Sequence, residues 1–192
     1  MINKKNITGI ILAGGKSSRM GSDKAQLLFK GKTFLNHVID ALKPLVDEVL
    51  IVSNNKEHGN FNFKRVPDTL SGAGPLAGLH AGLNHSNTDI NFVLSCDVPL
   101  IQTSLLELIL SNNEEYKDVI QIESEGKTHH LIALYKKSVA PHFLSVLNEG
   151  ERRLSKAIKG LNVKTISIPK TEQYAVKNIN SREDLKNIEH EN

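Results

Sequence analysis

The sequence predicts a three-layer α/β/α fold, built on a mostly parallel sheet with antiparallel additions in the C-terminal half. Three observations support this prediction. Short, continuously apolar runs recur in the first half, which is typical of parallel strands buried on both faces. Segments with apolar residues at helical spacing alternate with these runs. The second half adds two strand-like runs around a Gly-containing turn, which indicates a hairpin.

The first elements follow from apolar periodicity and capping residues. A strand is expected at Ile7–Leu12, followed by a polar, Gly-containing loop through Asp23. Thr33 is suited to cap a helix, because its hydroxyl can accept a hydrogen bond from the first helical turn. Two further strands are expected at Glu48–Ser53 and Lys64–Val66. The apolar residues that give the helix its spacing are Phe34, Leu35, Val38, Ile39 and Leu42.

From residue 74 onward the alternation continues. The hairpin turn is placed at Gly126, and Ser181 opens a C-terminal helix through a capping box in which Asp184 replaces the usual Glu or Gln. The other expected elements are a helix from Leu76 to about His85, a strand at Ile90–Cys96, a helix at Thr103–Leu110, hairpin strands at Asp118–Glu123 and Leu131–Tyr135, helices at Ser138–Leu147 and Arg152–Ile158, and a strand at Val163–Ile168.

The composition is that of one globular domain, residues 1–192. Hydrophobic residues make up 39% and charged residues 23%, without a repeat or a low-complexity tract. The net charge of +3 is too small to indicate a nucleic-acid partner, and no apolar run is long enough for a signal peptide or a membrane span. A single cysteine, Cys96, fits a reducing compartment. We therefore expect a cytoplasmic protein with no membrane or nucleic-acid partner.

The charge is distributed unevenly along the chain. Residues 1–68 carry 11 Lys/Arg against 6 Asp/Glu, residues 69–135 carry 2 against 8, and residues 136–192 carry 11 against 7. Basic outer thirds around an acidic middle suit a site that holds anionic groups together with a cation. Solvated faces that happen to cluster explain the same pattern.

The stretch TGIILAGGKSSRMGSDK, residues 8–24, invites comparison with known phosphate-binding loops. A P-loop would need a glycine at position 10, where this chain has Ile10, and Gly9 is one position too early. The dinucleotide-binding fingerprint also fails, because the next glycine after Gly14-Gly15 is Gly21. Neither motif is present.

The residues after the first strand still suit an anion. Small residues at the carboxyl end of a strand let a ligand approach the main chain, and ligands of open α/β sheets bind at that edge. Lys16, Arg19 and Lys24 follow within nine residues and could neutralise a polyphosphate. An exposed basic loop without a ligand is the alternative.

The loop also carries a specific resemblance. LAGGKSSRMGSDK resembles the signature L-A-G-G-x-S-x-R-M-G-x-D-K of nucleotidyltransferases that act on small molecules, in particular the molybdenum cofactor guanylyltransferases. The resemblance extends over nearly the whole chain. It continues through Lys30-Gly31-Lys32, VPD at 66–68, GPLAG at 74–78, CDVP at 96–99, GERR at 150–153 and Asn178-Ile179-Asn180.

The resemblance implies a Rossmann-like nucleotidyltransferase fold and a magnesium-dependent reaction. GMP would pass from GTP to molybdopterin or the molybdenum cofactor, forming the guanine dinucleotide form and pyrophosphate. It also implies a nucleotide-binding half at residues 1–100 and an acceptor-binding half at 101–192. Transient contacts with other cofactor-biosynthesis proteins or the recipient enzyme would follow.

Asp97 is the first acidic residue after the strand Ile90–Cys96, so it should project from the same sheet edge as Gly14-Gly15. A carboxylate there could hold Mg²⁺ against phosphate oxygens, or it could cap the turn before Val98-Pro99. With the resemblance we favour the metal role for Asp97. Cys96 beside it is interpreted as a small buried residue, because no His is adjacent to it in the sequence.

The resemblance assigns the remaining site residues except Arg152 and Arg153. These two arginines, at the start of a predicted helix, could clamp the acceptor's phosphate, and exposed helix charges are the alternative. We expect Arg19, Lys24 and Asp97 to be catalytic. The expected GTP-binding residues are Leu12, Ala13, Gly14, Gly15, Lys24, Asp68, Gly74, Pro75, Leu76, Gly78 and Asp97. The expected acceptor-binding residues are Arg152, Arg153, Asn178 and Asn180. His129-His130 is interpreted as structural or as a contact to the second substrate, because adjacent strand residues point to opposite faces.

Three alternatives remain at this stage. The first is a sister nucleotidyltransferase that transfers another base, such as cytidylyl transfer to the same pterin, or that uses another acceptor. The second is a non-catalytic nucleotide-binding module that regulates a partner. The third, an NAD-binding oxidoreductase, is disfavoured by the failed glycine fingerprint.

Overall fold

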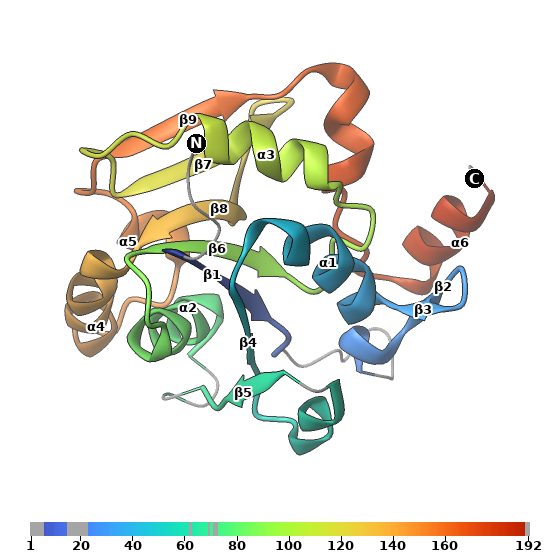
Figure 1. Cartoon of the computed structure of the whole chain (residues 1–192), viewed down its shortest axis with the longest axis horizontal. Coiled ribbons are helices and arrows are strands. Elements are labelled where there is room, and N and C mark those ends of the chain that lie inside the picture. Colours follow the sequence, from blue (N-terminus) through green and yellow to red (C-terminus); the bar gives the residue numbers. More distant parts are fainter. Residues whose placement is uncertain (1–5, 15–22, 62, 69, 71–72, 191–192) are drawn as a thin grey trace.

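The computed structural model describes residues 6–14, 23–61, 63–68, 70 and 73–190 of the chain. Its strands are β1 (Ile7–Leu12), β2 (Leu28–Phe29), β3 (Lys32–Thr33), β4 (Glu48–Val52), β5 (Lys64–Val66), β6 (Ile90–Ser95), β7 (Val119–Ser124), β8 (Lys127–Lys136) and β9 (Val163–Ser167). Seven of them form one sheet in the order β5-β4-β1-β6-β8-β7-β9, and β2 and β3 pair separately (Figure 1).

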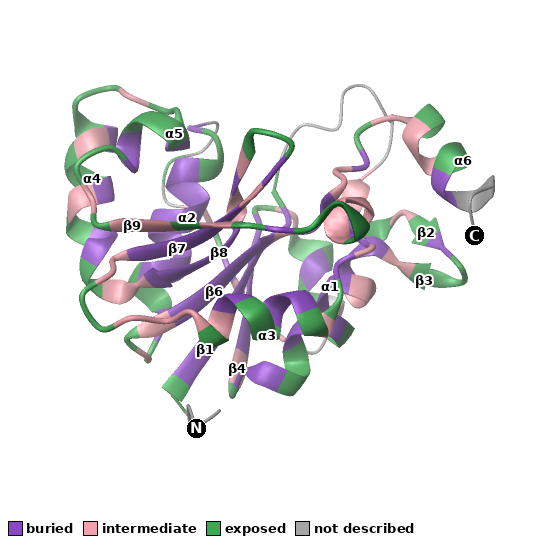
Figure 2. Ribbon diagram, turned by 90° about the horizontal axis from the view of Figure 1, so that it is seen from above, coloured by how far each residue is buried: buried purple, intermediate pink, exposed green. Residues whose placement is uncertain are grey.

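Helices cover both faces of the large sheet. The α-helices are α1 (Phe34–Leu42), α2 (Pro75–His85), α3 (Thr103–Ser111), α4 (Ala140–Asn148), α5 (Leu154–Ala157) and α6 (Arg182–His190). The 3-10 helices are η2 (Lys24–Gln26), η3 (Lys43–Leu45), η4 (Lys56–Phe61), η5 (Lys137–Val139) and η6 (Lys170–Val176). Figure 2 shows the buried sheet between α1 and α3 on one side and α2, α4 and α5 on the other. No helix in the described ranges is long and apolar enough to span a membrane.

The strand directions confirm the predicted mixed sheet. β1 pairs in parallel with β4 and with β6, and β4 pairs in parallel with β5. β8 is antiparallel to both β6 and β7, while β9 is parallel to β7. The antiparallel strand thus lies in the C-terminal half of the chain. Because the other six strands run the same way, their carboxyl ends meet at one edge, where ligands of such sheets bind.

Glycines let helices approach β1 closely from both faces. A side chain at Gly9 would place its Cβ only 2.5 Å from Leu42 of α1. On the other face, a Cβ at Gly82 of α2 would lie 2.5 Å from Ile10. Real Cβ atoms do not make contacts this short, so a larger residue at either position would force its buried neighbour to move. The middle of β1 is therefore packed closely between α1 and α2.

The β7–β8 hairpin closes through a tight two-residue turn. Ser124 pairs with Lys127, and the residues between them, Glu125 and Gly126, both have positive φ, at 51° and 72°. This is the type I′ geometry that suits the twist of hairpin strands. β8 begins at Lys127, four residues earlier than predicted, so His129 lies within the strand.

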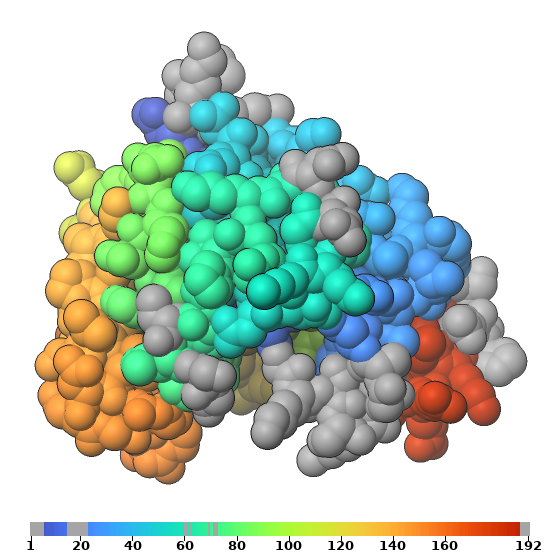
Figure 3. All heavy atoms as spheres, turned by 90° about the horizontal axis from the view of Figure 1, so that it is seen from below, coloured from blue at the N-terminus to red at the C-terminus, as the bar shows by residue number. Residues whose placement is uncertain are grey.

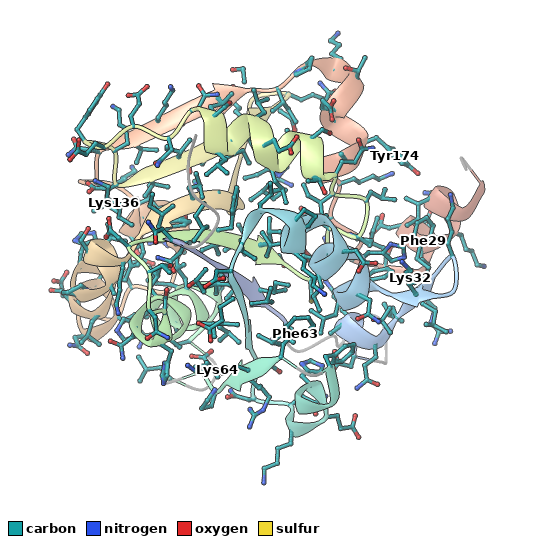
Figure 4. The ribbon with its side chains drawn as sticks, viewed as in Figure 1. Phe29, Lys32, Phe63, Lys64, Lys136 and Tyr174 are labelled. Carbon is teal, nitrogen blue, oxygen red and sulfur yellow. The ribbon has the colours of Figure 1, made fainter. Side chains whose placement is uncertain are left out.

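A small third core joins the C-terminus to the β2–β3 hairpin. Phe29, Phe34, Ile179 and Ile188 are buried together, and Figure 4 shows Phe29 beside α6. In the space-filling view of Figure 3, α6 likewise lies next to the segment that contains β2 and β3. Segments from opposite ends of the chain therefore support each other near the sheet edge.

Four α-helices, α2 to α5, begin without a side-chain cap, and two predicted helix starts are corrected. The helix expected at Ser138–Leu147 begins at Ala140, because Lys137–Val139 form the separate 3-10 helix η5. Thr33 Oγ1 accepts the N–H of Asn36, which confirms the predicted cap of α1. The predicted helix Arg152–Ile158 is wrong at its start, because α5 begins at Leu154. The Glu151 carboxylate accepts the N–H groups of Arg152 and Arg153, which holds these residues in a turn before the helix.

Candidate active site

Three segments meet at the carboxyl edge of the parallel strands. Backbone hydrogen bonds extend the sheet one residue beyond β1 and β6: Ala13 N–H donates to Val52 O, and Cys96 N–H donates to Leu12 O. Asp97 therefore leaves the sheet beside the end of β1. This placement agrees with the expectation that both strand ends share one site.

Lys24 and Asp97 form an ion pair at this edge. The Lys24 Nζ lies 3.5 Å from Asp97 Oδ2, and their side chains are 23% and 14% exposed. Lys24 is the first residue of η2, so it reaches the edge from the chain segment that follows β1. Partial burial makes such a pair stronger than one on the open surface. The ammonium group of Lys24 remains partly exposed in this pair, so a phosphate group could approach it.

Two asparagines from the C-terminal segment complete the arrangement. Asn178 Nδ2 donates to Asp97 Oδ1 at 2.8 Å, and Lys24 Nζ donates to Asn180 Oδ1 at 2.5 Å. The backbone N–H of Ile179, between them, donates to the carbonyl of Asp97 at 2.8 Å. We call Lys24, Asp97, Asn178 and Asn180 the lysine–aspartate cluster. Four predicted site residues, separated by up to 156 positions, are therefore brought together.

The thiol beside this cluster is not a nucleophile. Cys96 is buried, and burial together with the neighbouring charge of Asp97 raises its pKa to about 12. Only the thiolate attacks electrophiles, so a thiol with this pKa is inert at neutral pH. The interpretation of Cys96 as a buried residue is confirmed.

The end of β5 and the start of α2 lie at the same edge. Burial raises the pKa of Asp68, whose backbone N–H donates to Asn54 Oδ1 at 2.9 Å. Gly74 adopts φ of 75° and precedes Pro75, the first residue of α2, and both are exposed. A helix N-terminus that begins this way can face an anion.

Several expected nucleotide-binding residues are buried in the core. Leu76 is fully buried, and Gly78 packs against Leu12 and Val52, so neither offers a side chain to a ligand. Leu12 and Ala13 are buried too, and their main-chain groups already pair with neighbouring strands. Gly14 is exposed. Gly15, Lys16 and Arg19 lie outside the described residues.

Arg152 lies beside Gly74, and among the described residues no hydrogen bond or ion pair joins Arg152 or Arg153 to the cluster. The carbonyl of Arg152 would be 3.7 Å from a Cβ at Gly74. Arg153 binds Glu151 with two hydrogen bonds of 2.9 and 2.7 Å, which lower the pKa of Glu151 to about 2. Arg152 Nη1 donates to Leu147 O at 2.6 Å. The four expected acceptor residues therefore fall into two separate places.

His129 and His130 occupy different environments. His129 Nε2 bonds with Ser124 Oγ at 2.9 Å, while His130 Nδ1 bonds with Gln121 Oε1 at 2.8 Å. Burial lowers the pKa of both rings, which favours their neutral forms. No group of three or more His, Cys, Asp or Glu suited to a metal occurs in the described part of the chain.

Sequence reasoning missed the side chains that hold the start of η2. Asp23 Oδ2 accepts hydrogen bonds from Asn55 Nδ2 at 2.6 Å and from His58 Nε2 at 2.8 Å. Asp23 lies in the signature stretch directly before Lys24. This position could have indicated that Asp23 supports the lysine. Asn55 and His58 had no such signal, because they follow a different strand.

The sheet edge, the clustered cation and carboxylate and the exposed helix start define an α/β protein whose sheet edge can receive an anionic ligand. Comparison with known proteins narrows this class. The MobA-like NTP transferase domain matches residues 9–164, and the chain belongs to this family.

Relatives match along most of the chain. A probable molybdenum cofactor guanylyltransferase of Flavobacterium johnsoniae is 35% identical over 96% of this chain and 97% of its own length. The molybdenum cofactor guanylyltransferase of Yersinia pestis (strain Pestoides F) is 33% identical over 84% of each chain. A crystal structure of an Aquifex aeolicus VF5 protein, 31% identical, superposes with a TM-score of 0.81 over 94% of this chain and 96% of that one.

Proposed function

We propose that this chain transfers GMP from GTP to molybdopterin, with or without its metal, and releases pyrophosphate. The observation that carries the proposal is the pairing of Lys24 with Asp97 at the carboxyl edge of the parallel strands. Family membership and the names of relatives that match most of the chain support the same reaction.

In this reaction an oxygen of the acceptor's terminal phosphate attacks the α-phosphorus of GTP. The bond from that phosphorus to the bridging oxygen breaks in line, and pyrophosphate leaves with the negative charge. The protein needs to position the two phosphates and to offset this charge. Lys24 would do so through its ammonium group. Arg19 is proposed for the same task, although it lies outside the described residues.

Asp97 would hold Mg²⁺. Its donor chemistry fits this ion, because Mg²⁺ prefers oxygen and is often bound by one or two carboxylates with phosphates and water completing the shell. Asp97 Oδ1 is fixed by Asn178, while among the described residues Oδ2 has only the 3.5 Å contact to Lys24, which leaves it able to bind an ion. When bound, Mg²⁺ supplies Lewis-acid charge that stabilises phosphate oxygens.

The two groups of acceptor candidates receive different tasks. Asn178 and Asn180 would fix the cluster and face the reacting phosphates. Arg152 and Arg153 would bind a phosphate near the start of α2, and Arg153 would then have to leave Glu151. Because the Arg153 side chain is 68% exposed, solvent screens this pair and a phosphate can compete with Glu151 for the guanidinium.

A pyrophosphate-release assay tests the proposal. The purified chain is mixed with Mg²⁺, molybdopterin and either GTP or CTP, and we expect acceptor-dependent pyrophosphate with GTP. Release with CTP alone would overturn the choice of base. Nucleotide binding without release in either mixture would contradict catalysis. Chelation of Mg²⁺ with EDTA should abolish turnover, and readdition should restore it.

A further inference from the structure

The carboxylate of Asp23, one residue before Lys24, is bound by three groups from two parts of the chain. Asp23 Oδ1 accepts the N–H of Ala25 at 3.0 Å and so caps η2. Asp23 Oδ2 accepts from Asn55 and His58, which follow β4. Both oxygens are therefore used, and none of these bonds points to the lysine–aspartate cluster. We call Asp23, Asn55 and His58 the Asp23 bracket.

His58 is built into the protein as a donor to Asp23. Its side chain has no exposed surface, and the ring packs edge-on against Phe61. A carboxylate only accepts hydrogen bonds, so the 2.8 Å contact places a proton on Nε2. Nδ1 is buried and has no hydrogen-bond partner among the described residues. A buried polar ring with a single partner is costly, and such a group calls for an explanation beyond packing.

The Asp23 bracket is anchored to the sheet. Asn55 N–H donates to Ser53 Oγ at 3.0 Å, and Ser53 N–H donates to Val66 O of β5 at 2.9 Å. Asn55 and His58 therefore keep fixed positions relative to β4 and β5. Because they bind the carboxylate of Asp23, the N-cap of η2, they also restrict the backbone of Lys24, the first residue of η2.

We infer that Asn55 and His58 are positioning residues for the transfer reaction, which hold Lys24 against Asp97 through the carboxylate of Asp23. The inference rests on the proposed function for its kinetic consequence. Lys24 has a long flexible side chain, so the direction of its ammonium group depends on where its backbone is held. A displacement of about 1 Å in a reacting site can lower the rate by about 100-fold.

Three variants separate positioning from packing. His58→Leu fills the ring's space and removes the donor, and we expect kcat/KM for GTP to fall by about 10- to 100-fold. His58→Gln keeps an amide N–H that can reach Asp23, so most of the activity should return. Asp23→Asn replaces one accepting oxygen by an NH₂ group, which cannot accept the hydrogen bonds that Asp23 receives. Its kcat/KM should fall as in His58→Leu. Lys56→Ala, an exposed substitution in η4, is the matched control and should keep the wild-type kcat/KM.

A double-mutant comparison identifies the route of the effect. In a Lys24→Ala background, His58→Leu should cause no further loss, because its influence passes through Lys24. If His58 only stabilised the fold, His58→Leu would lower the melting temperature while the folded enzyme kept its kcat/KM. That result, or an equal loss in both backgrounds, would overturn the inference.

A measurement independent of turnover keeps the inference testable if the proposed function fails. Heteronuclear NMR of isotope-labelled protein reports the lysine ammonium groups, and the Lys24 signal is assigned by its loss in Lys24→Ala. We expect this signal to shift or disappear in His58→Leu and Asp23→Asn and to persist in His58→Gln and Lys56→Ala. An unchanged Lys24 signal in His58→Leu would overturn the positioning role, whatever reaction the chain performs.

Discussion

At the scale of single residues, the two oxygens of Asp97 have different surroundings. Oδ1 is fixed by the amide of Asn178, and Oδ2 faces the ammonium of Lys24. The carboxylate is thereby oriented before any ligand binds, so little reorganisation is needed in the transition state. Asn178 holds Asp97 and Asn180 binds Lys24, so these two charged side chains keep a defined orientation at the centre of the site.

Removal of either charged partner should stop turnover without unfolding the protein. Lys24→Ala and Asp97→Ala each delete a preorganised charge, which typically costs ~2.7–4 kcal/mol of barrier. We therefore expect turnover to fall by about two to three orders of magnitude. Steady-state kinetics with circular dichroism measures both properties. Lys32→Ala, which removes an exposed ion pair with Asp40, is the control and should behave like the wild type. Near-normal turnover in the Lys24 or Asp97 variant would refute the assignment.

Cys96 should not react with thiol reagents in the native protein. Its pKa of about 12 leaves about one thiolate in ten thousand at pH 8. Because this is the only cysteine in the chain, modification by a chromogenic disulfide reagent reports it alone. We expect reaction only after denaturation. The raised pKa also means that stability falls as the pH rises from about 9, where the unfolded thiol ionises, towards 12. Rapid modification of the folded chain would contradict this burial.

The sequence predicted part of the site at this scale. Strand order placed Asp97 beside the end of β1, and the residues themselves favoured an anion near Lys24. The contact of Asn178 with Asp97 spans 81 positions, and no local pattern encodes it. Only the resemblance indicated Asn178, and nothing indicated the buried pairing of His58 with Asp23.

At the scale of elements, the spacing of apolar residues and the capping residues predicted the bounds of the longer strands and helices well. Ile7–Leu12 was predicted at its observed bounds, and the other main strands were within one residue at their ends, with β8 as the exception. The short helices η2 and η4 were not predicted, since segments this short carry no periodicity. Their form depends on side chains such as Asp23 and Asn55 that bond across the fold.

The capping box of α6 connects helix stability to the site. Asp184 N–H donates to Ser181 Oγ, and the Asp184 carboxylate accepts the N–H groups of Ser181 and Asn180. These bonds, with that of Asn180 first, lower the pKa of Asp184. Its contribution to stability is thus present above pH 3.8 and is lost as the pH falls below that value.

Ser181→Ala should therefore lower the free energy of unfolding by about 1 kcal/mol, the usual effect of losing an N-cap hydroxyl. Urea unfolding followed by circular dichroism measures the change. Ser155→Ala, at an exposed position in α5, serves as the comparison and should change it little. Equal stability of Ser181→Ala and the wild type would show that the box does not hold α6.

At the scale of the whole molecule, the site depends on segments from both ends of the chain. Residues after β1 supply Lys24, the end of β6 supplies Asp97, and the segment before α6 supplies the asparagines. Ile179 lies between those asparagines and is fully buried against Phe29 and Phe34. The small third core therefore holds the C-terminal part of the site in place.

Because the site is shared in this way, nucleotide binding should stabilise the whole fold. A ligand at 100 times its Kd adds about 2.7 kcal/mol to the free energy of unfolding. With GTP and Mg²⁺ present, we expect slower amide hydrogen exchange at 23–26, 96–98 and 178–180 together, because one ligand orders all three segments. The same addition to Lys24→Ala should give weaker protection at all three. If exchange slowed only at 23–26, the nucleotide would not order the segment of Asn178 and Asn180. Those asparagines would then serve only to hold Asp97 and Lys24 in place.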